Sequence, residues 1–160
     1  MKTNETAVVT TIVAVDPATA FSVFTNEIGA WWKPKVKNLI GKNPGGTMKF
    51  EPGPAGRLLE VYEDAPDHPF EVGRILIWQP PERLVFEWKQ ENFSPGESTQ
   101  VEVRFEPVAR GTRVTLEHHG WDAFPSGHPA RHGYTGEAFS SMMGLRWADL
   151  LTSFRSHVRG

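Results

Sequence analysis

The chain has 160 residues, 39% of them hydrophobic and 22% charged, which is ordinary globular usage for a single domain over residues 1–160. A net charge of −2 without any Lys/Arg run speaks against a nucleic-acid partner, and the lack of cysteine excludes disulfides and a thiol nucleophile. We recognise neither a signal peptide nor a membrane-spanning apolar run, and therefore expect a cytoplasmic protein with no membrane span.

The N-terminal part predicts one strand followed by two short helices. Residues 7–15 are apolar and β-branched, which favours a strand. Asp16 and Pro17 suit the N-cap and first position of a helix, whose apolar spacing runs to Gly29. Pro34 blocks helix beyond the pair of tryptophans at 31–32.

The middle of the chain predicts six further strands separated by short connections rich in glycine and proline. We place them at residues 47–51, 57–63, 70–78, 83–90, 99–106 and 112–119. Residues 64–69, with two prolines, are expected to form a loop. Strands this close in sequence form an antiparallel meander, because parallel strands need long crossovers.

Residues 137–158 change to the helical period, with apolar residues three, four or seven positions apart. The sequence therefore predicts an α+β fold, in which a curved antiparallel sheet of about seven strands wraps around a long C-terminal helix. A curled sheet leaves room against a straight helix, because its twist accumulates from strand to strand. We expect that room to hold an apolar guest.

Alternation along the strands indicates which side chains face the helix. In the strand at 57–63, Glu60 and Tyr62 share a face with Leu58. Arg74 is predicted to share the face of Val72, Leu76 and Trp78, and His118 the face of Val114 and Leu116. Polar members of apolar faces need partners or ligands.

Three local patterns resemble one known family. Residues 78–88, WQPPERLVFEW, and residues 99–121, TQVEVRFEPVARGTRVTLEHHGW, resemble two hairpins of the activator-of-Hsp90-ATPase-homologue family. Trp147, Leu151 and Phe154 match its C-terminal helix pattern, and the Asp16–Pro17 helix entry matches as well. The resemblance implies the helix-grip fold of the START-like (SRPBCC) superfamily, whose members enclose a deep hydrophobic cavity.

From these observations we predict a protein that binds a small hydrophobic ligand, such as a lipid or polyketide, between sheet and helix. The predicted ligand-binding residues are Glu60, Tyr62, Arg74, Trp78, Phe86, Trp88, Phe105, Leu116, His118, Trp121, Met143, Trp147 and Leu150. Glu60, Arg74 and His118 would orient a polar end of that ligand. We expect a monomer or weak dimer without a cofactor.

Two alternatives stay open beside simple binding. The same cavity could serve a cyclase or dehydratase with Glu60 or His118 as acid–base groups, although no nucleophile elbow or phosphate loop is present. The resemblance also implies a chaperone ATPase as an alternative partner. A metal site is not predicted, because Pro129 interrupts the helical spacing of His128 and His132.

Overall fold

The computed structural model describes residues 6–32, 46–63, 65–89, 93–94, 96–121, 124, 128 and 136–159. Within these ranges one antiparallel sheet has the strand order β1-β7-β6-β5-β4-β3-β2. Its strands are β1 (Ala7–Val13), β2 (Gly46–Phe50), β3 (Arg57–Tyr62), β4 (Ala65–Gln79), β5 (Arg83–Trp88), β6 (Thr99–Val108) and β7 (Gly111–His119). The helices are α1 (Pro17–Asn26), α2 (Ile28–Trp31) and α3 (Gly136–Arg159).

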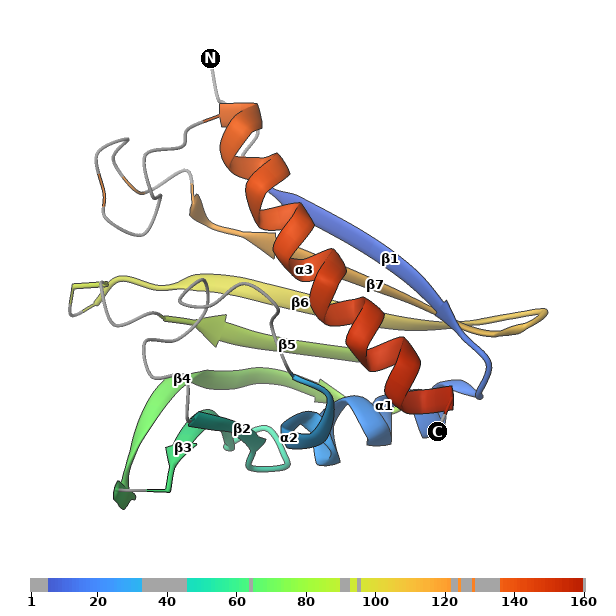
Figure 1. Ribbon diagram of the computed structural model, residues 1–160, viewed down its shortest axis with the longest axis horizontal. Helices are drawn as coiled ribbons and strands as arrows, with labels where there is room; N and C mark the ends of the chain where they lie inside the picture. The colour runs from blue at the N-terminus through green and yellow to red at the C-terminus, as the bar shows by residue number, and fades with distance from the viewer. Residues whose placement is uncertain are drawn as a thin grey trace.

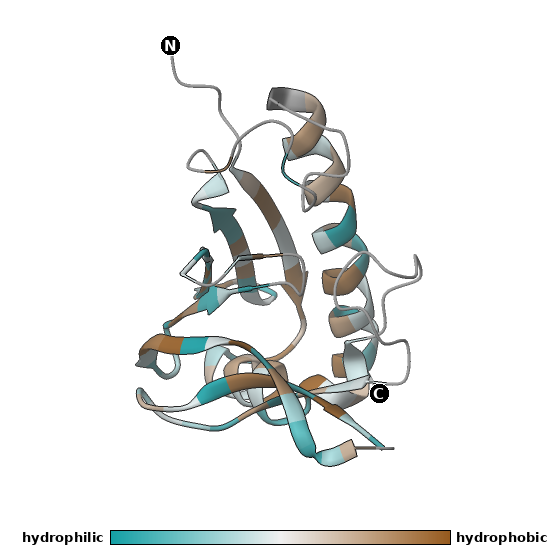
Figure 2. Cartoon of the chain, turned by 90° about the vertical axis from the view of Figure 1, so that its left-hand side faces the viewer, coloured by the Kyte–Doolittle hydropathy of each residue, from teal (hydrophilic) through white to brown (hydrophobic). Residues whose placement is uncertain are grey.

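The long helix α3 lies along the concave side of the curved sheet, and α1 and α2 pack near its C-terminal end (Figure 1). A view turned by 90° shows the sheet bending around the space that faces α3 (Figure 2). The predicted seven-stranded curved sheet, long C-terminal helix and pair of short helices are confirmed. No helix in the described part of the chain combines the length and apolarity needed to cross a bilayer.

Local sequence explains where the first helix begins. The side chain of Asp16 accepts a hydrogen bond from the Thr19 main-chain N–H at 2.9 Å, and Pro17 occupies the first turn. These are the predicted N-cap and first-turn roles. The cap turns the chain directly after β1, so that Phe21 and Phe24 of α1 are buried against the sheet.

Strand β4 is longer than predicted, because residues 65–69 extend it instead of forming a loop. Among the described residues only β3 pairs with this portion, and the pairing with β5 begins at Ile75. Pro66 and Pro69 are tolerated there, since a strand lacking one neighbour can spare main-chain N–H groups. The extension carries Phe70 opposite Glu60 on β3.

Register shifts along β4 overturn one predicted face. Irregularities between Leu58 and Leu59 and between Ile75 and Ile77 each change the alternation of side chains. Ile75 is therefore buried, while Arg74 and Leu76 are exposed. The prediction that Arg74 faces the interior and orients a ligand there is wrong.

Gly73 allows the closest approach between β4 and β5. A Cβ atom at this position would lie 1.7 Å from the main-chain oxygen of Glu87. Only glycine permits that contact, and the irregular pairing beside it bends the sheet more sharply. This bend helps the inner face close around the helix.

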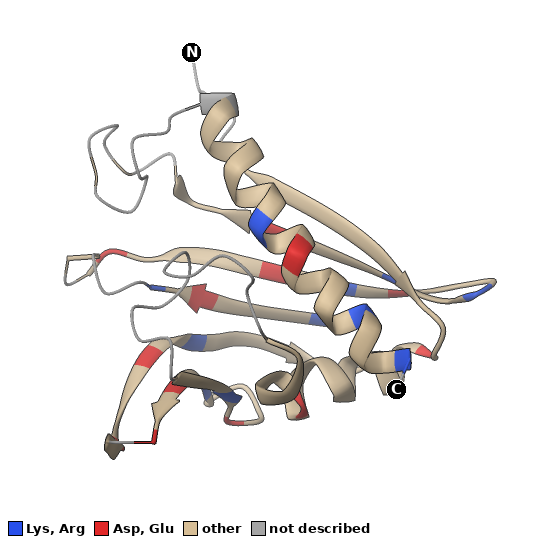
Figure 3. Ribbon diagram, viewed as in Figure 1, with Lys and Arg blue, Asp and Glu red and all other residues tan. Residues whose placement is uncertain are grey.

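The outer face of the sheet is polar, as the alternation in β6 and β7 predicts. Arg83 on β5 pairs with Glu102 on β6 at 2.7 Å, and Arg104 on β6 pairs with Glu117 on β7. Figure 3 shows acidic and basic residues interspersed over these strands. Exposed pairs of this kind stabilise only weakly, so the inner face carries the fold.

Candidate functional site

The interior between sheet and α3 is filled by aromatic side chains in two groups. The first group lies beside α1 and the C-terminal half of α3, where Phe24 contacts Trp31, Phe105 and Phe154 with ring centroids 4.9–5.8 Å apart. Trp31 also donates its indole N–H to the main-chain oxygen of Phe24 at 3.2 Å. These satisfied, interlocked contacts close this end of the interior.

The second group surrounds the middle of α3 and contains most of the predicted ligand-binding tryptophans. Trp147 on α3 contacts Trp88 and Trp32 at centroid distances of 5.5 Å, and Trp32 stacks on Trp88 at 5.9 Å and 28°. His118 and Trp121 complete the group at 5.2 Å from each other. Here three strands, α3 and the end of α2 converge.

A directed chain of hydrogen bonds runs through this second group. The indole N–H of Trp147 can only donate, so its 3.0 Å contact makes Nδ1 of His118 the acceptor. Nε2 of His118 then carries the proton and donates to Oγ1 of Thr99 at 2.7 Å. The Thr99 hydroxyl in turn donates to the main-chain oxygen of Trp88 at 3.3 Å. The chain ties α3 to β7, β6 and β5.

His118 is held as a neutral imidazole by this environment. It is fully buried, and burial lowers its pKa from 6.5 to about 3, with a smaller effect from neighbouring His119. Both ring nitrogens are already engaged in hydrogen bonds. The hydrogen bonds on both ring nitrogens hold the imidazole in one orientation.

The indole nitrogen of Trp88 differs from that of Trp147. Trp88 Nε1 is buried and has no hydrogen-bond acceptor among the described residues. Leaving a buried donor unsatisfied costs about 1–3 kcal/mol. Native structures rarely tolerate such groups, and those that remain need an explanation such as an absent water or ligand. The indole N–H of Trp88 is therefore the group in this interior that most clearly needs such an explanation.

Glu60 supplies a carboxylate to the same inner face, two strands away from Trp88. It is 6% exposed, lies opposite Met48 and Phe70, and accepts a hydrogen bond from the Tyr62 hydroxyl at 3.1 Å. A Cβ at Gly46 would lie 2.3 Å from its Oε2, so the carboxylate rests against that glycine. Two strand spacings correspond to about 10 Å.

The other predicted site residues fall into different places. Phe86, Phe105, Leu116 and Leu150 are at most 2% exposed and belong to the packed core, and Met143 is 4% exposed. Trp78 packs edge-on against Phe21 and lines a surface groove of about 340 Å³ beside α1. Trp78 therefore lies with the first aromatic group, away from Trp88.

Sequence reasoning missed Thr99 and did not include Trp32 among the predicted ligand-binding residues. Thr99 opens a strand, and nothing in its neighbours shows that its hydroxyl will meet His118, because that contact joins residues 19 positions apart. Among the described residues, no three His, Asp or Glu side chains gather as a metal site needs. His132, one of the two spaced histidines, lies outside the described residues.

A curved seven-stranded antiparallel sheet that grips a C-terminal helix defines the helix-grip fold of the START-like (SRPBCC) superfamily. Within it, residues 14–158 match the family described as Activator of Hsp90 ATPase homolog 1-like protein. The chain belongs to this family. No curated protein sequence matches it.

Solved structures with the same fold cover nearly the whole chain. Protein CV1439 from Chromobacterium violaceum is 17% identical with a TM-score of 0.62, over 98% of this chain and 99% of its own. The AHSA1 (SPO3351) protein from Silicibacter pomeroyi is 16% identical with a TM-score of 0.61, over 96% and 97%. Txn09, an anthrahydroquino-gamma-pyrone synthase complexed with SUM, is 27% identical with a TM-score of 0.58, over 96% and 97%.

Proposed function

We propose that this protein binds a flat, oxygen-bearing aromatic molecule of the polyketide type between α3 and the sheet. The observation that carries the proposal is the buried indole N–H of Trp88, which has no acceptor in the described structure. A carbonyl or phenol oxygen of the ligand would accept its hydrogen bond. The name of Txn09, which is 27% identical, supports an aromatic polycyclic ligand class.

The geometry favours a ligand that bridges Trp88 and Glu60. Their strands, β5 and β3, are separated by β4, so the two strands run about 10 Å apart in the sheet. This span suits a few fused rings with a carbonyl at one end and a phenol at the other. The carboxylate of Glu60 would accept from the phenol, beside the Tyr62 hydroxyl.

A ligand can enter only by displacing an aromatic side chain, because the described side chains of the second aromatic group are already in contact with one another. Trp32 is the most exposed of its tryptophans at 8%, and its ring covers that of Trp88. A ligand ring that replaces Trp32 keeps aromatic contact with Trp88, and a ligand oxygen in the plane of the indole ring, beyond its edge, accepts the missing hydrogen bond. Stacking contributes about 0.5–1.5 kcal/mol beyond the area buried.

Titration calorimetry with alizarin, a dihydroxyanthraquinone, tests the proposal. Trp88→Phe keeps an aromatic ring and removes the donor, so we expect affinity about tenfold weaker than that of the wild type. Trp78→Phe, on the same sheet but in the other aromatic group, is the matched control and should change affinity less than twofold. Equal affinity of wild type and Trp88→Phe would remove the basis of the proposal.

A second candidate function is catalysis on such a ligand, favoured by the hydrogen-bonded pair of Glu60 and Tyr62 on the inner face. A carboxylate in a mostly buried site can act as a general base toward a phenol or an acidic C–H group. Under this hypothesis Glu60→Gln abolishes turnover of a polyphenolic substrate and leaves its binding within about threefold. A Glu60→Gln variant that still turns the substrate over would exclude the carboxylate as the base.

A further inference from the structure

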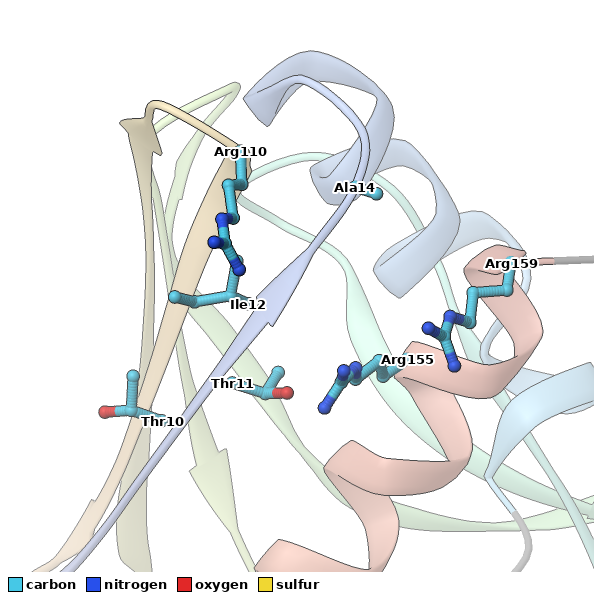
Figure 4. A pocket seen from close by; sticks show the side chains of 7 residues that line it. All are labelled: Thr10, Thr11, Ile12, Ala14, Arg110, Arg155 and Arg159. Atoms are coloured by element: carbon cyan, nitrogen blue, oxygen red, sulfur yellow. The ribbon is translucent and has the colours of Figure 1, made fainter.

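A second pocket lies on the surface at the C-terminal end of α3. It has a volume of about 510 Å³ and is formed by edge strand β1, the turn between β6 and β7, and the last two turns of α3 (Figure 4). Its polar lining consists of Thr10, Thr11, Arg110, Arg155 and Arg159. Aspartate and glutamate are absent from its described lining.

The three arginines reach the pocket from two separate elements. Arg155 and Arg159 are four residues apart on α3 and therefore share one face of the helix. Arg155 points toward Thr11 of β1, whereas Arg110 lies beside Ile12 on the other side of that strand (Figure 4). The arrangement surrounds the edge of β1 with guanidinium groups from both sides.

These arginines differ from three arginines on the outer face of the sheet. On the strands, Arg57, Arg83 and Arg104 each pair with a glutamate. Within the described part of the chain, Arg110, Arg155 and Arg159 form no ion pair. The carboxylate of Asp16, in the connection from β1 to α1, accepts a hydrogen bond from the Thr19 main-chain N–H and forms no ion pair with these arginines in the described part of the chain. Basic residues gather at this end of α3, beside an acidic segment where β1 leads into α1 (Figure 3).

Charge balance indicates that the pocket suits an anion. The C-terminus of a helix carries about half a negative charge, which one cation would more than neutralise. The three guanidinium groups exceed this partial negative charge, in a protein whose net charge is −2. Like charges four residues apart on a helix destabilise it by a few tenths of a kcal/mol, and a bound anion would remove that repulsion.

The kind of anion follows from the donors. The planar fork of N–H donors in a guanidinium group matches phosphate and carboxylate oxygens in bidentate fashion. The hydroxyls of Thr10 and Thr11 can add single hydrogen bonds. The volume falls in the range of small-molecule sites and exceeds what one oxyanion fills. Ile12 offers apolar surface to an organic body.

We propose that this arginine pocket binds a small organic anion carrying at least two phosphate or carboxylate groups. The pocket is separate from the aromatic interior and does not depend on the function proposed for it. It lies at the C-terminal end of α3, whereas Trp147 lies in the middle of that helix, so the two sites can be tested independently.

Calorimetric titrations at low ionic strength with inorganic pyrophosphate, with citrate and with anionic phosphatidylglycerol vesicles test the pocket. The variants are Arg155→Gln/Arg159→Gln, Arg110→Gln, and the control Arg74→Gln, which removes one charge from the outer face of β4. Each of these arginines is exposed, so all variants should fold, and circular dichroism checks that they do.

We expect saturable binding of pyrophosphate or citrate, at least tenfold weaker in the α3 double variant and at least threefold weaker in Arg110→Gln. Arg74→Gln should bind within twofold of the wild type. Whichever of pyrophosphate and citrate binds with the higher affinity indicates whether the pocket prefers phosphate or carboxylate groups. Equal weakening in Arg74→Gln, no saturable binding of either small anion, or binding to the vesicles alone would overturn the proposal.

Discussion

Trp147 on α3 donates its indole N–H to Nδ1 of His118 on β7 at 3.0 Å, deep inside the protein. This bond fixes the tautomer of the histidine, because an indole nitrogen cannot accept. It also sets the direction of the next hydrogen bond, since Nε2 of His118 must then donate to Oγ1 of Thr99. One helix position thereby orders side chains from two strands, β7 and β6.

The pH dependence of stability should reveal His118. Its pKa is lowered from 6.5 to about 3 by burial, so the unfolded chain takes up a proton on this side chain at a higher pH than the folded protein. The contribution of His118 to the free energy of unfolding is fully present above pH 6.5 and is lost as the pH falls toward 3. Between pH 6.5 and 4.5 we expect a loss of about 2–3 kcal/mol in the free energy of unfolding.

Urea denaturation at several pH values measures this loss. His118→Gln removes the titrating group, so its stability, although lower at neutral pH, should vary much less between pH 6.5 and 4.5. The carboxyls of Glu51 and Glu102, whose pKa values are lowered beside arginines, add their own loss only near and below pH 4.5. Parallel pH curves for the wild type and His118→Gln would contradict the neutral, buried imidazole.

The two central tryptophans should respond differently to the same substitution. Trp147→Phe removes a hydrogen bond and leaves Nδ1 of His118 buried without its donor, whereas Trp88→Phe removes an N–H that has no acceptor among the described residues. Both lose a similar volume. We therefore expect Trp147→Phe to be about 1–3 kcal/mol less stable than Trp88→Phe in urea. Equal stabilities would mean that the hydrogen-bond chain contributes nothing.

Two glycine substitutions should have opposite effects on stability. At Gly73 a methyl group would lie 1.7 Å from the Glu87 main-chain oxygen, so Gly73→Ala should cost about 3 kcal/mol, the upper range for overpacking. Gly144 on α3 has open space at that position, and Gly144→Ala should stabilise by about 0.5–1 kcal/mol through helix propensity. Thermal unfolding compares them, and a neutral Gly73→Ala would contradict the close contact between β4 and β5.

Removing the ring that covers Trp88 should help the proposed ligand to bind. Trp32→Ala leaves space above Trp88, so alizarin should bind several-fold more tightly and raise the melting temperature of the variant more than that of the wild type. Trp78→Ala, at the surface groove beside α1, is the control and should show no such gain. A Trp32→Ala variant that binds alizarin more weakly than the wild type would mean that Trp32 belongs to the binding site itself.

The sequence predicts most of this fold because its signals are local. Strict alternation in β6 and β7 places Val103 and Leu116 inward and Glu102 outward, and the Asp16 cap marks the start of α1. Arg74 was misplaced because register shifts in β4 depend on how close β5 approaches at Gly73, and that contact joins distant positions. Alternation alone carries no information on bulges.

The site was predictable in composition but not in detail. The sequence indicates that Trp88, His118 and Trp147 share the interior, and they do. It does not show which indole is satisfied, because Thr99, His118 and Trp147 come from separate elements brought together only by the fold. A role for these residues in ligand binding stays a prediction, as does any contact with a chaperone.

The indole N–H signal of Trp88 tests the central claim most directly. In a ¹⁵N-tryptophan-labelled sample, six indole resonances are expected from the six tryptophans, and Trp88→Phe assigns one of them. On titration with alizarin, we predict that the Trp88 resonance moves downfield by more than any other, as its proton gains an acceptor, while that of Trp78 stays in place. A Trp88 resonance unchanged at saturating alizarin would contradict the account.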